Sequence, residues 1–194
     1  MNTLPRLALS VRQPWAWAII HGGKDIENRT WQAVNHGLRQ RGRIAIHASK
    51  GLTRDEYESA SDFMLSQMVA CPEPHELLRG GIIGSVGVVD VVSESESPWF
   101  FGPRGLVLRD PQPCEFVPAI GALGYFEWKP ADASVAPAPA RWMLPEEQRE
   151  EQPRAPRAPR KSAYADNPNL ELFSETALQI GDVTVTPAVG RIRS

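Results

Sequence analysis

The chain has 194 residues, 18 of them proline, and its formal net charge is −2 at pH 7. This length suits one domain with tails, and no apolar run is long enough for a signal peptide or a membrane span, so we expect neither. The two cysteines, Cys71 and Cys114, form no metal-ligand spacing, so we expect reduced thiols in a cytoplasmic protein without a metal or another cofactor.

The first predicted elements are a strand over residues 7–11 and a short helix. Pro14 suits the first position of a helix, and Gly22-Gly23 ends it by allowing positive φ, which leaves about two turns. The segment between them, Trp15-Ala16-Trp17-Ala18-Ile19-Ile20, is apolar on every side. We therefore expect this helix to be largely enclosed by the rest of the domain.

A densely polar segment follows the helix and is predicted to be extended. Within a strand, Glu27 and Arg29 share one face, while Ile26 and Asn28 share the other. A polar strand that leaves a buried helix is expected to line a cleft. The polar residues of this segment are Lys24, Asp25, Glu27, Asn28 and Arg29.

An exposed loop over residues 32–42 leads into a strand over residues 43–47. The alternation of that strand places both isoleucines in the core and His47 on the opposite face, with space above Ala45. His47 either hydrogen-bonds a ligand or caps the following turn. The basic side chains of this segment are Arg39, Arg41 and Arg43. They either contact phosphate or form a merely solvated surface.

Residues 53–92 are predicted to form a helix and then a bent strand. Thr53 and Glu56 have the spacing of a capping box, and the apolar residues up to Met68 recur at helical spacing, which indicates a core-facing stripe. The following β-branched run includes Gly84 and Gly87, which we expect at bends or a bulge of a barrel.

Three aromatic residues, Trp99-Phe100-Phe101, precede the last predicted strands, over residues 105–110 and 122–128. We expect most of these rings to plug one end of a barrel, with a stacking contact to a base as the alternative for Trp99. Several short strands with two helices suit a small barrel flanked by helices.

Seven prolines lie between Pro130 and Pro159, with few large apolar residues. Such a segment cannot bury enough surface to offset its ordering entropy. We therefore predict a domain over residues 1–130 and a mostly disordered tail over residues 131–194. The tail contains a basic tract that either attracts nucleic acid or serves as a linker, consisting of Arg154, Arg157, Arg160 and Lys161.

The charges divide unevenly between the two halves of the predicted domain. Residues 1–54 carry nine Lys or Arg against two acids, whereas residues 55–130 carry four against twelve. A basic first half is what an anionic ligand requires. Within it, Lys24 and Arg29 are donors for phosphate or carbonyl oxygens, and Glu27 accepts from a base or holds Arg29. In the alternative interpretation, these three form a structural ion cluster.

Flat side chains complete this candidate site. We expect Trp31, ahead of Trp15, to offer a face for a nucleobase, and Arg12 or Gln13 to make an edge contact. Positive charge, a stacking surface and a hydrogen-bond acceptor are together typical of single-nucleotide recognition.

The pattern Gln13-Pro14-Trp15, then Gly22-x-Lys24-x-x-Glu27-x-Arg29-x-Trp31, resembles the signature of the ASCH domain, a member of the PUA-like group of small β-barrels. The resemblance covers roughly residues 5–130. It implies an α+β fold, a small PUA-like β-barrel of about five to six strands flanked by two or three helices, and binding of RNA or nucleotides. Its later pieces are Ile44 to Lys50, Gly81 to Gly84, Trp99-Phe100 before Gly105 to Leu108, and Gly121 to Phe126.

The resemblance also implies a possible enzymatic activity, because some family members are amidohydrolases that act on acetylated cytidine and others have nuclease activity. The amidohydrolase pattern has a Lys followed three positions later by a nucleophilic Thr. Lys24 matches that Lys, but Glu27 stands in the place of the Thr. A hydrolase would therefore need Glu27 as a general base and Lys24 to stabilise an oxyanion.

Our first hypothesis is a monomeric module that binds RNA or a modified nucleotide. The alternatives are a metal-independent hydrolase with Lys24 and Glu27 as catalytic residues, and a protein-interaction adaptor. The predicted ligand-binding residues are Arg12, Gln13, Lys24, Glu27, Arg29, Trp31, His47 and Trp99.

Overall fold

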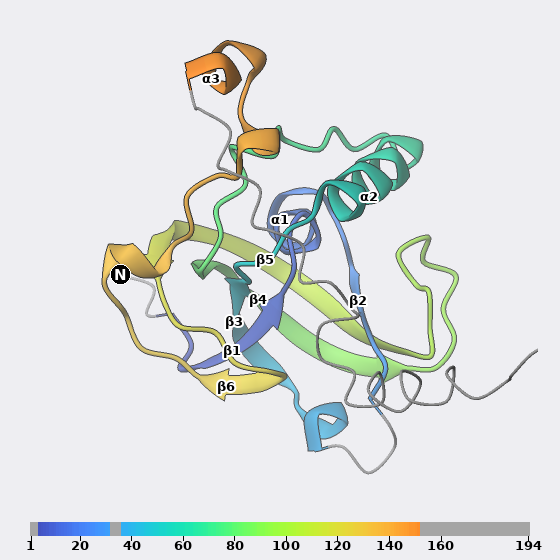
Figure 1. Cartoon of the computed structure of the whole chain (residues 1–194). Helices are drawn as coiled ribbons and strands as arrows, with labels where there is room; N and C mark the ends of the chain where they lie inside the picture. The colour runs from blue at the N-terminus through green and yellow to red at the C-terminus, as the bar shows by residue number, and fades with distance from the viewer. Residues whose placement is uncertain (1–3, 32–35, 152–194) are drawn as a thin grey trace, which may run out of the picture. The chain divides into compact units, whose positions relative to one another are not determined.

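The computed structural model describes residues 4–31 and 36–151. In these residues one sheet has the strand order β2-β5-β4-β3-β1-β6, with β1 and β3 parallel and the other pairs antiparallel (Figure 1). The sheet curls into a half barrel, which confirms the predicted α+β fold. The strands are β1 (Leu7–Val11), β2 (Ile26–Arg29), β3 (Gly42–Ala48), β4 (Gly81–Val92), β5 (Arg104–Pro118) and β6 (Tyr125–Glu127).

The helix α1 (Trp15–His21) lies against β3, β4 and β5, and its Ala and Ile side chains are buried, as its sequence predicts. The helix α2 (Arg54–Ser66) begins at the predicted capping box, in which the Glu56 amide donates to Thr53 Oγ1 over 3.3 Å and the Thr53 amide to Glu56 Oε2 over 2.9 Å. No helix in the described part is long and apolar enough to cross a membrane. The remaining helical segments are η1 (His36–Arg39), η2 (Ala133–Val135), η3 (Arg141–Met143) and α3 (Glu146–Glu151).

The curl of the sheet arises in the two long strands β4 and β5. Their pairing shifts register at three places, and each shift bends the strand that carries the extra residue. A Cβ atom at Gly84 would lie 2.6 Å from the Gln112 carbonyl oxygen and 2.8 Å from the Ile20 side chain. Gly84 therefore lets β5 and α1 come close at one of the predicted bends.

The parallel pair β1 and β3 is buried on both faces, as is usual for parallel strands. One face, with Leu9 and Ile46, packs against α1, and the other carries a smaller core of Ala8, Ala45, Ile82 and Ala119. The sequence predicted space above Ala45, and this was wrong, because the segment after β5 returns over that face and fills it.

The half barrel has two edge strands, β2 and β6, and side chains rather than backbone bonds connect the two sides. Arg29 of β2 donates from Nη2 to the Ser10 carbonyl oxygen of β1 over 3.0 Å, and β1 in turn pairs with β6. Trp31 lies two residues after the end of β2, and its ring centroid lies 5.5 Å from that of Tyr125 in β6. This seam is where the candidate site lies.

Two predicted strands differ in length from the observed ones. β5 begins at Arg104 and extends to Pro118 instead of residue 110, while β6 covers only Tyr125–Glu127 of the predicted 122–128. The longer β5 includes three prolines, and its exposed second half pairs with β4 without the hydrophobic pattern on which the prediction relied.

Residues beyond 130 contribute to the buried interior. Met143 is 2% exposed and packs with Leu52 and Leu77, and Arg79 donates to the carbonyl oxygens of Lys50 and Ala138 over 2.9 and 3.1 Å. The predicted tail covers residues 131–194. Its part from residue 152 onward, with the basic tract from Arg154 to Lys161, lies outside the described residues. The predicted domain boundary at residue 130 stays a prediction.

Replacement of Met143 tests whether this later segment stabilises the domain. We expect Met143→Ala to lower the free energy of unfolding by about 2–5 kcal/mol, since it removes a fully buried side chain. Met68→Ala is the matched control, because Met68 is 95% exposed. Urea unfolding of the full chain measures both, and equal stabilities of the two variants would show that residues near 143 do not support the core.

Candidate functional site

The polar strand β2 carries a chain of three charges. Glu27 Oε1 lies 3.1 Å from Arg29 Nη2, and Glu27 Oε2 lies 3.6 Å from Lys24 Nζ. The exposed fractions of the side chains rise along the chain, from 2% for Lys24 to 10% for Glu27 and 17% for Arg29. The three charges therefore form the predicted structural ion cluster, and they also converge as predicted. Lys24 is the buried end of this chain of charges, and Arg29 is its partly open end.

Lys24 occupies the buried end. Its Nζ donates to the Ile26 carbonyl oxygen and lies 5.6 Å from the ring centroids of both Trp15 and Trp99. Burial lowers the pKa of Lys24, and the nearby Glu27 carboxylate opposes that shift. The side chain is only 2% exposed, so a molecule in solvent has little access to this ammonium group.

Arg29 occupies the open end, at the seam of the half barrel. Besides its bonds to Glu27 and the Ser10 carbonyl oxygen, its guanidinium carbon lies 5.3 Å from the Trp31 ring centroid. Its Nε is buried and has no hydrogen-bond partner among the described residues. Glu27 and Ser10 thus fix the guanidinium group in place and leave one donor unused.

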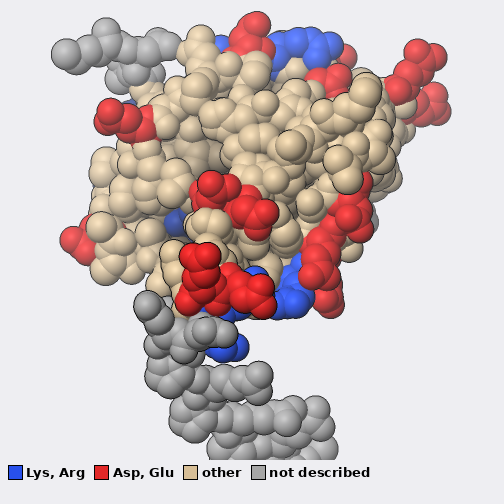
Figure 2. Space-filling view, turned by 90° about the horizontal axis from the view of Figure 1, so that it is seen from above, with Lys and Arg blue, Asp and Glu red and all other residues tan. Residues whose placement is uncertain are grey.

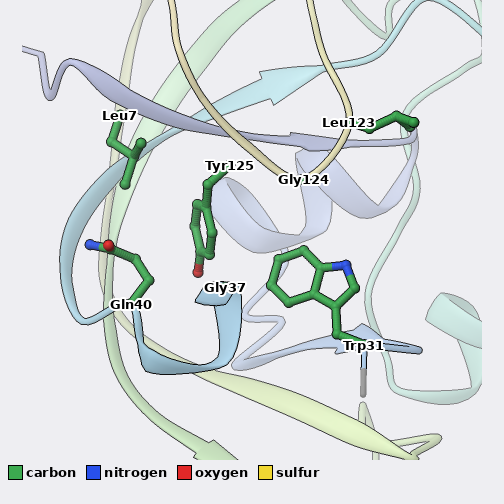
Figure 3. Close-up of a pocket in the computed structure, with 7 residues that line it drawn as sticks. All are labelled: Leu7, Trp31, Gly37, Gln40, Leu123, Gly124 and Tyr125. Atoms are coloured by element: carbon green, nitrogen blue, oxygen red, sulfur yellow. The ribbon is translucent and has the colours of Figure 1, made fainter. Parts of the chain in front are cut away.

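A hollow of about 440 Å³ opens beside Trp31, between η1 and β6 (Figure 3). We call it the first hollow. Trp31 and Tyr125 form aromatic parts of its wall, and the hydroxyl end of Tyr125 points toward the side where Gly37 and Gln40 lie. The lining residues are Leu7, Trp31, Gly37, Gln40, Leu123, Gly124 and Tyr125.

The Tyr125 hydroxyl is the second buried polar group without a partner at this place. Its oxygen is inaccessible to water and makes no hydrogen bond within the described residues. Burial raises its pKa to about 12. The hydroxyl therefore keeps its proton at neutral pH and is able to donate a hydrogen bond.

Glycine at position 37 determines the position of the Trp31 ring. A Cβ atom there would lie 2.4 Å from an atom of that ring, which no real contact allows. Any side chain at this position would push the indole out of the wall. The first hollow therefore depends on a residue that no motif singled out.

Four other predicted ligand residues have partners within the protein. Arg12 forms an ion pair of 2.6 Å with Glu56, Trp99 is buried with Trp15 and Phe63, and Gln13 donates to the Leu78 carbonyl oxygen over 2.8 Å. His47 lies between Ser10 Oγ at 2.9 Å from Nδ1 and the Ala119 carbonyl oxygen at 3.1 Å from Nε2. The structure therefore places Trp31 in the wall of the first hollow, with Arg29 against the Trp31 ring but not among the lining residues, and it places these four elsewhere.

The predicted basic loop is only partly available for a ligand. Arg41 forms an ion pair of 3.0 Å with Asp90, and Arg43 donates to Ser85 Oγ over 3.0 Å. Arg39 is exposed. Within the described residues, Arg39 alone of the three has no hydrogen bond or ion pair, so phosphate contacts from this loop stay a prediction.

Sequence reasoning missed Tyr125, Gln40 and Leu7 as parts of the site. Tyr125 could have been identified from the sequence. It lies next to Phe126 in a short strand that follows Gly124, and adjacent residues of a strand point to opposite faces. Gln40 and Leu7 had none, because their proximity to Trp31 depends on how the edges of the sheet meet. Among the described residues, no group of three or more His, Cys, Asp or Glu is arranged to hold a metal ion.

Comparison with known proteins places this site within a recognised domain. The family model described as "ASCH domain" matches residues 9–132, a range that contains the whole charge chain and the first hollow apart from Leu7. A human protein, "Activating signal cointegrator 1", is 29% identical over 119 residues. The match covers 53% of this chain and 20% of that protein, so the chain spans about a fifth of its relative.

The buried end of the charge chain predicts a loss of stability when Lys24 is removed. Lys24→Ala leaves the buried Glu27 with one cation fewer and opens a space between two indole rings, so we expect a loss of about 3–5 kcal/mol in the free energy of unfolding. Arg6→Ala is the control, because it breaks an exposed ion pair with Glu127, where we expect a loss below about 1 kcal/mol. Chemical denaturation measures both, and a cost for Lys24→Ala no greater than for Arg6→Ala would contradict the sealed position of Lys24.

Proposed function

Since the chain belongs to the ASCH domain family, we propose that it binds a nucleotide or single-stranded RNA, and that the base enters the first hollow. The observation that carries the proposal is the pair of buried, unpartnered polar atoms at this hollow, Arg29 Nε and Tyr125 Oη. Buried polar groups are nearly always hydrogen-bonded, so we infer that a small shift of the wall side chains lets a ligand supply the partners of these two unused donors.

The chemistry of the hollow suits a nucleotide. The ring of Trp31 offers a face on which a base stacks, Tyr125 and Gln40 offer hydrogen-bonding groups at its edge, and Arg29 offers a cation for phosphate. The volume of about 440 Å³ lies within the range of small-molecule sites. In this proposal Lys24 and Glu27 position Arg29 and do not touch the ligand.

The distribution of charge favours approach from the side of the seam. Figure 2 views the face on which α2 and α3 lie, and acidic side chains are spread over much of it. The first hollow lies between η1 and β6, at the other end of the molecule in Figure 1. An anionic strand that approaches the hollow therefore avoids the acidic face.

The two alternative functions have less support. A hydrolase that uses Lys24 and Glu27 needs both groups free for a substrate, whereas both are buried and already have partners within the protein. The adaptor alternative rests on the name of the human relative, which describes a cointegrator, and on the acidic face in Figure 2. It stays a prediction, because the chain matches only 20% of that relative.

The hydroxyl group of Tyr125 gives the sharpest test. We expect Tyr125→Phe to weaken binding about three- to tenfold, as the loss of one hydrogen bond does, without loss of stability, because the free protein leaves that hydroxyl unpaired. Isothermal titration of the full chain with a single-stranded RNA and with the four nucleoside 5′-monophosphates measures the affinity. Trp31→Ala, which removes the stacking surface, should weaken binding further, by about 1–3 kcal/mol.

Tyr57→Phe is the matched control. The Tyr57 hydroxyl donates to the Pro72 carbonyl oxygen over 2.9 Å, away from the first hollow. We expect this variant to lose stability and to keep its affinity, the reverse of Tyr125→Phe. Absence of saturable binding to every RNA and nucleotide, or binding that is indifferent to both Tyr125→Phe and Trp31→Ala, would overturn the proposal.

A further inference from the structure

A second hollow adjoins the first one. It has a volume of about 400 Å³, and Ser10, His47, Ser49 and Lys50 line it together with residues 120–123. Leu123 lines both hollows and is fully exposed, so its side chain stands on the rim between them. The two openings are therefore neighbouring parts of one surface along the end of β1.

Arg29 lines neither hollow but contacts one wall residue of each. Its guanidinium group stacks near Trp31 of the first hollow and donates to the carbonyl oxygen of Ser10, which lines the second. A cation that contacts a wall residue of each of two adjoining hollows suits a dinucleotide, in which one phosphodiester group lies between two nucleosides. Glu27 holds this cation from behind.

The wall of the second hollow is rigid and has a defined hydrogen-bonding pattern. A carbonyl oxygen only accepts, so His47 Nε2 carries the proton that is donated to Ala119, and Nδ1 accepts from the Ser10 hydroxyl. A Cβ atom at Gly121 would lie 2.4 Å from the His47 ring, so the segment after β5 lies directly on the imidazole. His47 is thereby a structural part of the wall, and burial lowers its pKa, which favours the neutral ring.

Two groups in the second hollow remain available to a ligand. Ser49 Oγ is buried and has no hydrogen-bond partner among the described residues. Lys50 is exposed, and its backbone is held by the bond from Arg79 to its carbonyl oxygen. A hydroxyl and an ammonium group side by side are suited to a phosphate oxygen.

We propose that the site takes two successive nucleotides of a single strand, with the first base on Trp31, the connecting phosphodiester at Arg29, and the second nucleotide against Ser49 and Lys50. This inference rests on the proposed function, because it needs the first base in the first hollow. It adds a length requirement, namely that a dinucleotide binds more tightly than either of its halves.

Titration of the full chain with mononucleotides and matched dinucleotides tests the second hollow. The probes are the four nucleoside 5′-monophosphates and the four 5′-phosphorylated homodinucleotides, in ribose and deoxyribose forms. We expect the better-bound dinucleotides to exceed their mononucleotides in affinity about tenfold or more, since they add a phosphate contact and a second nucleotide. The two sugar series show whether the 2′-hydroxyl contributes.

Lys50→Ala and Ser49→Ala should remove most of the added affinity of the dinucleotide and leave the mononucleotide unchanged. Lys50→Ala should also reduce the slope of log affinity against log salt by about 0.7, the value for one phosphate contact on a single strand. Lys129→Ala is the control, because Lys129 is exposed and lines neither hollow.

The outcomes separate the two proposals. The second hollow is not a subsite, and the first site stands, if mononucleotides bind in a Tyr125-dependent manner but dinucleotides bind no more tightly. The same conclusion follows if Lys50→Ala weakens the dinucleotide no more than Lys129→Ala does. If neither class of ligand binds, both proposals fail together.

Discussion

The buried carboxylate of Glu27 is the interaction on which the site depends. A carboxylate with so little contact with water is stable only beside cations, and Lys24 and Arg29 approach it from opposite sides. Lys24 lies beside two aromatic rings in the interior of the domain, whereas Arg29 lies further along the strand, at the seam of the half barrel. One buried charge thus connects the core of the domain to the edge where the sheet does not close.

The sequence was sufficient to predict the elements that local patterns determine. The short helix between Pro14 and Gly22, the capping box at Thr53 and the bends at Gly84 each follow from residues close together in the chain. The shared face of Glu27 and Arg29 followed from strand alternation, and the resemblance to the ASCH domain is confirmed by the family match.

The same reasoning could not predict contacts between segments that are far apart in the sequence. Lys24 is sealed by Trp99, which lies 75 positions further along the chain and is brought there by Asn28, whose side chain donates to the Trp99 carbonyl oxygen over 2.8 Å. Likewise, Tyr125 reaches Trp31 only because the two edge strands meet. Residue types and spacing identified the charges correctly, but they did not show which end of the charge chain faces water.

The exposed Leu123 has a thermodynamic consequence. It is 100% exposed on the rim shared by the two hollows, and Ile120 in the wall of the second hollow is 68% exposed, so apolar surface is in contact with water along this ridge. A strand that crosses this ridge would cover both side chains, and loss of hydrated apolar surface lowers the heat capacity of a complex. Association at this surface would then become more exothermic with rising temperature, although the ligand itself is a polyanion.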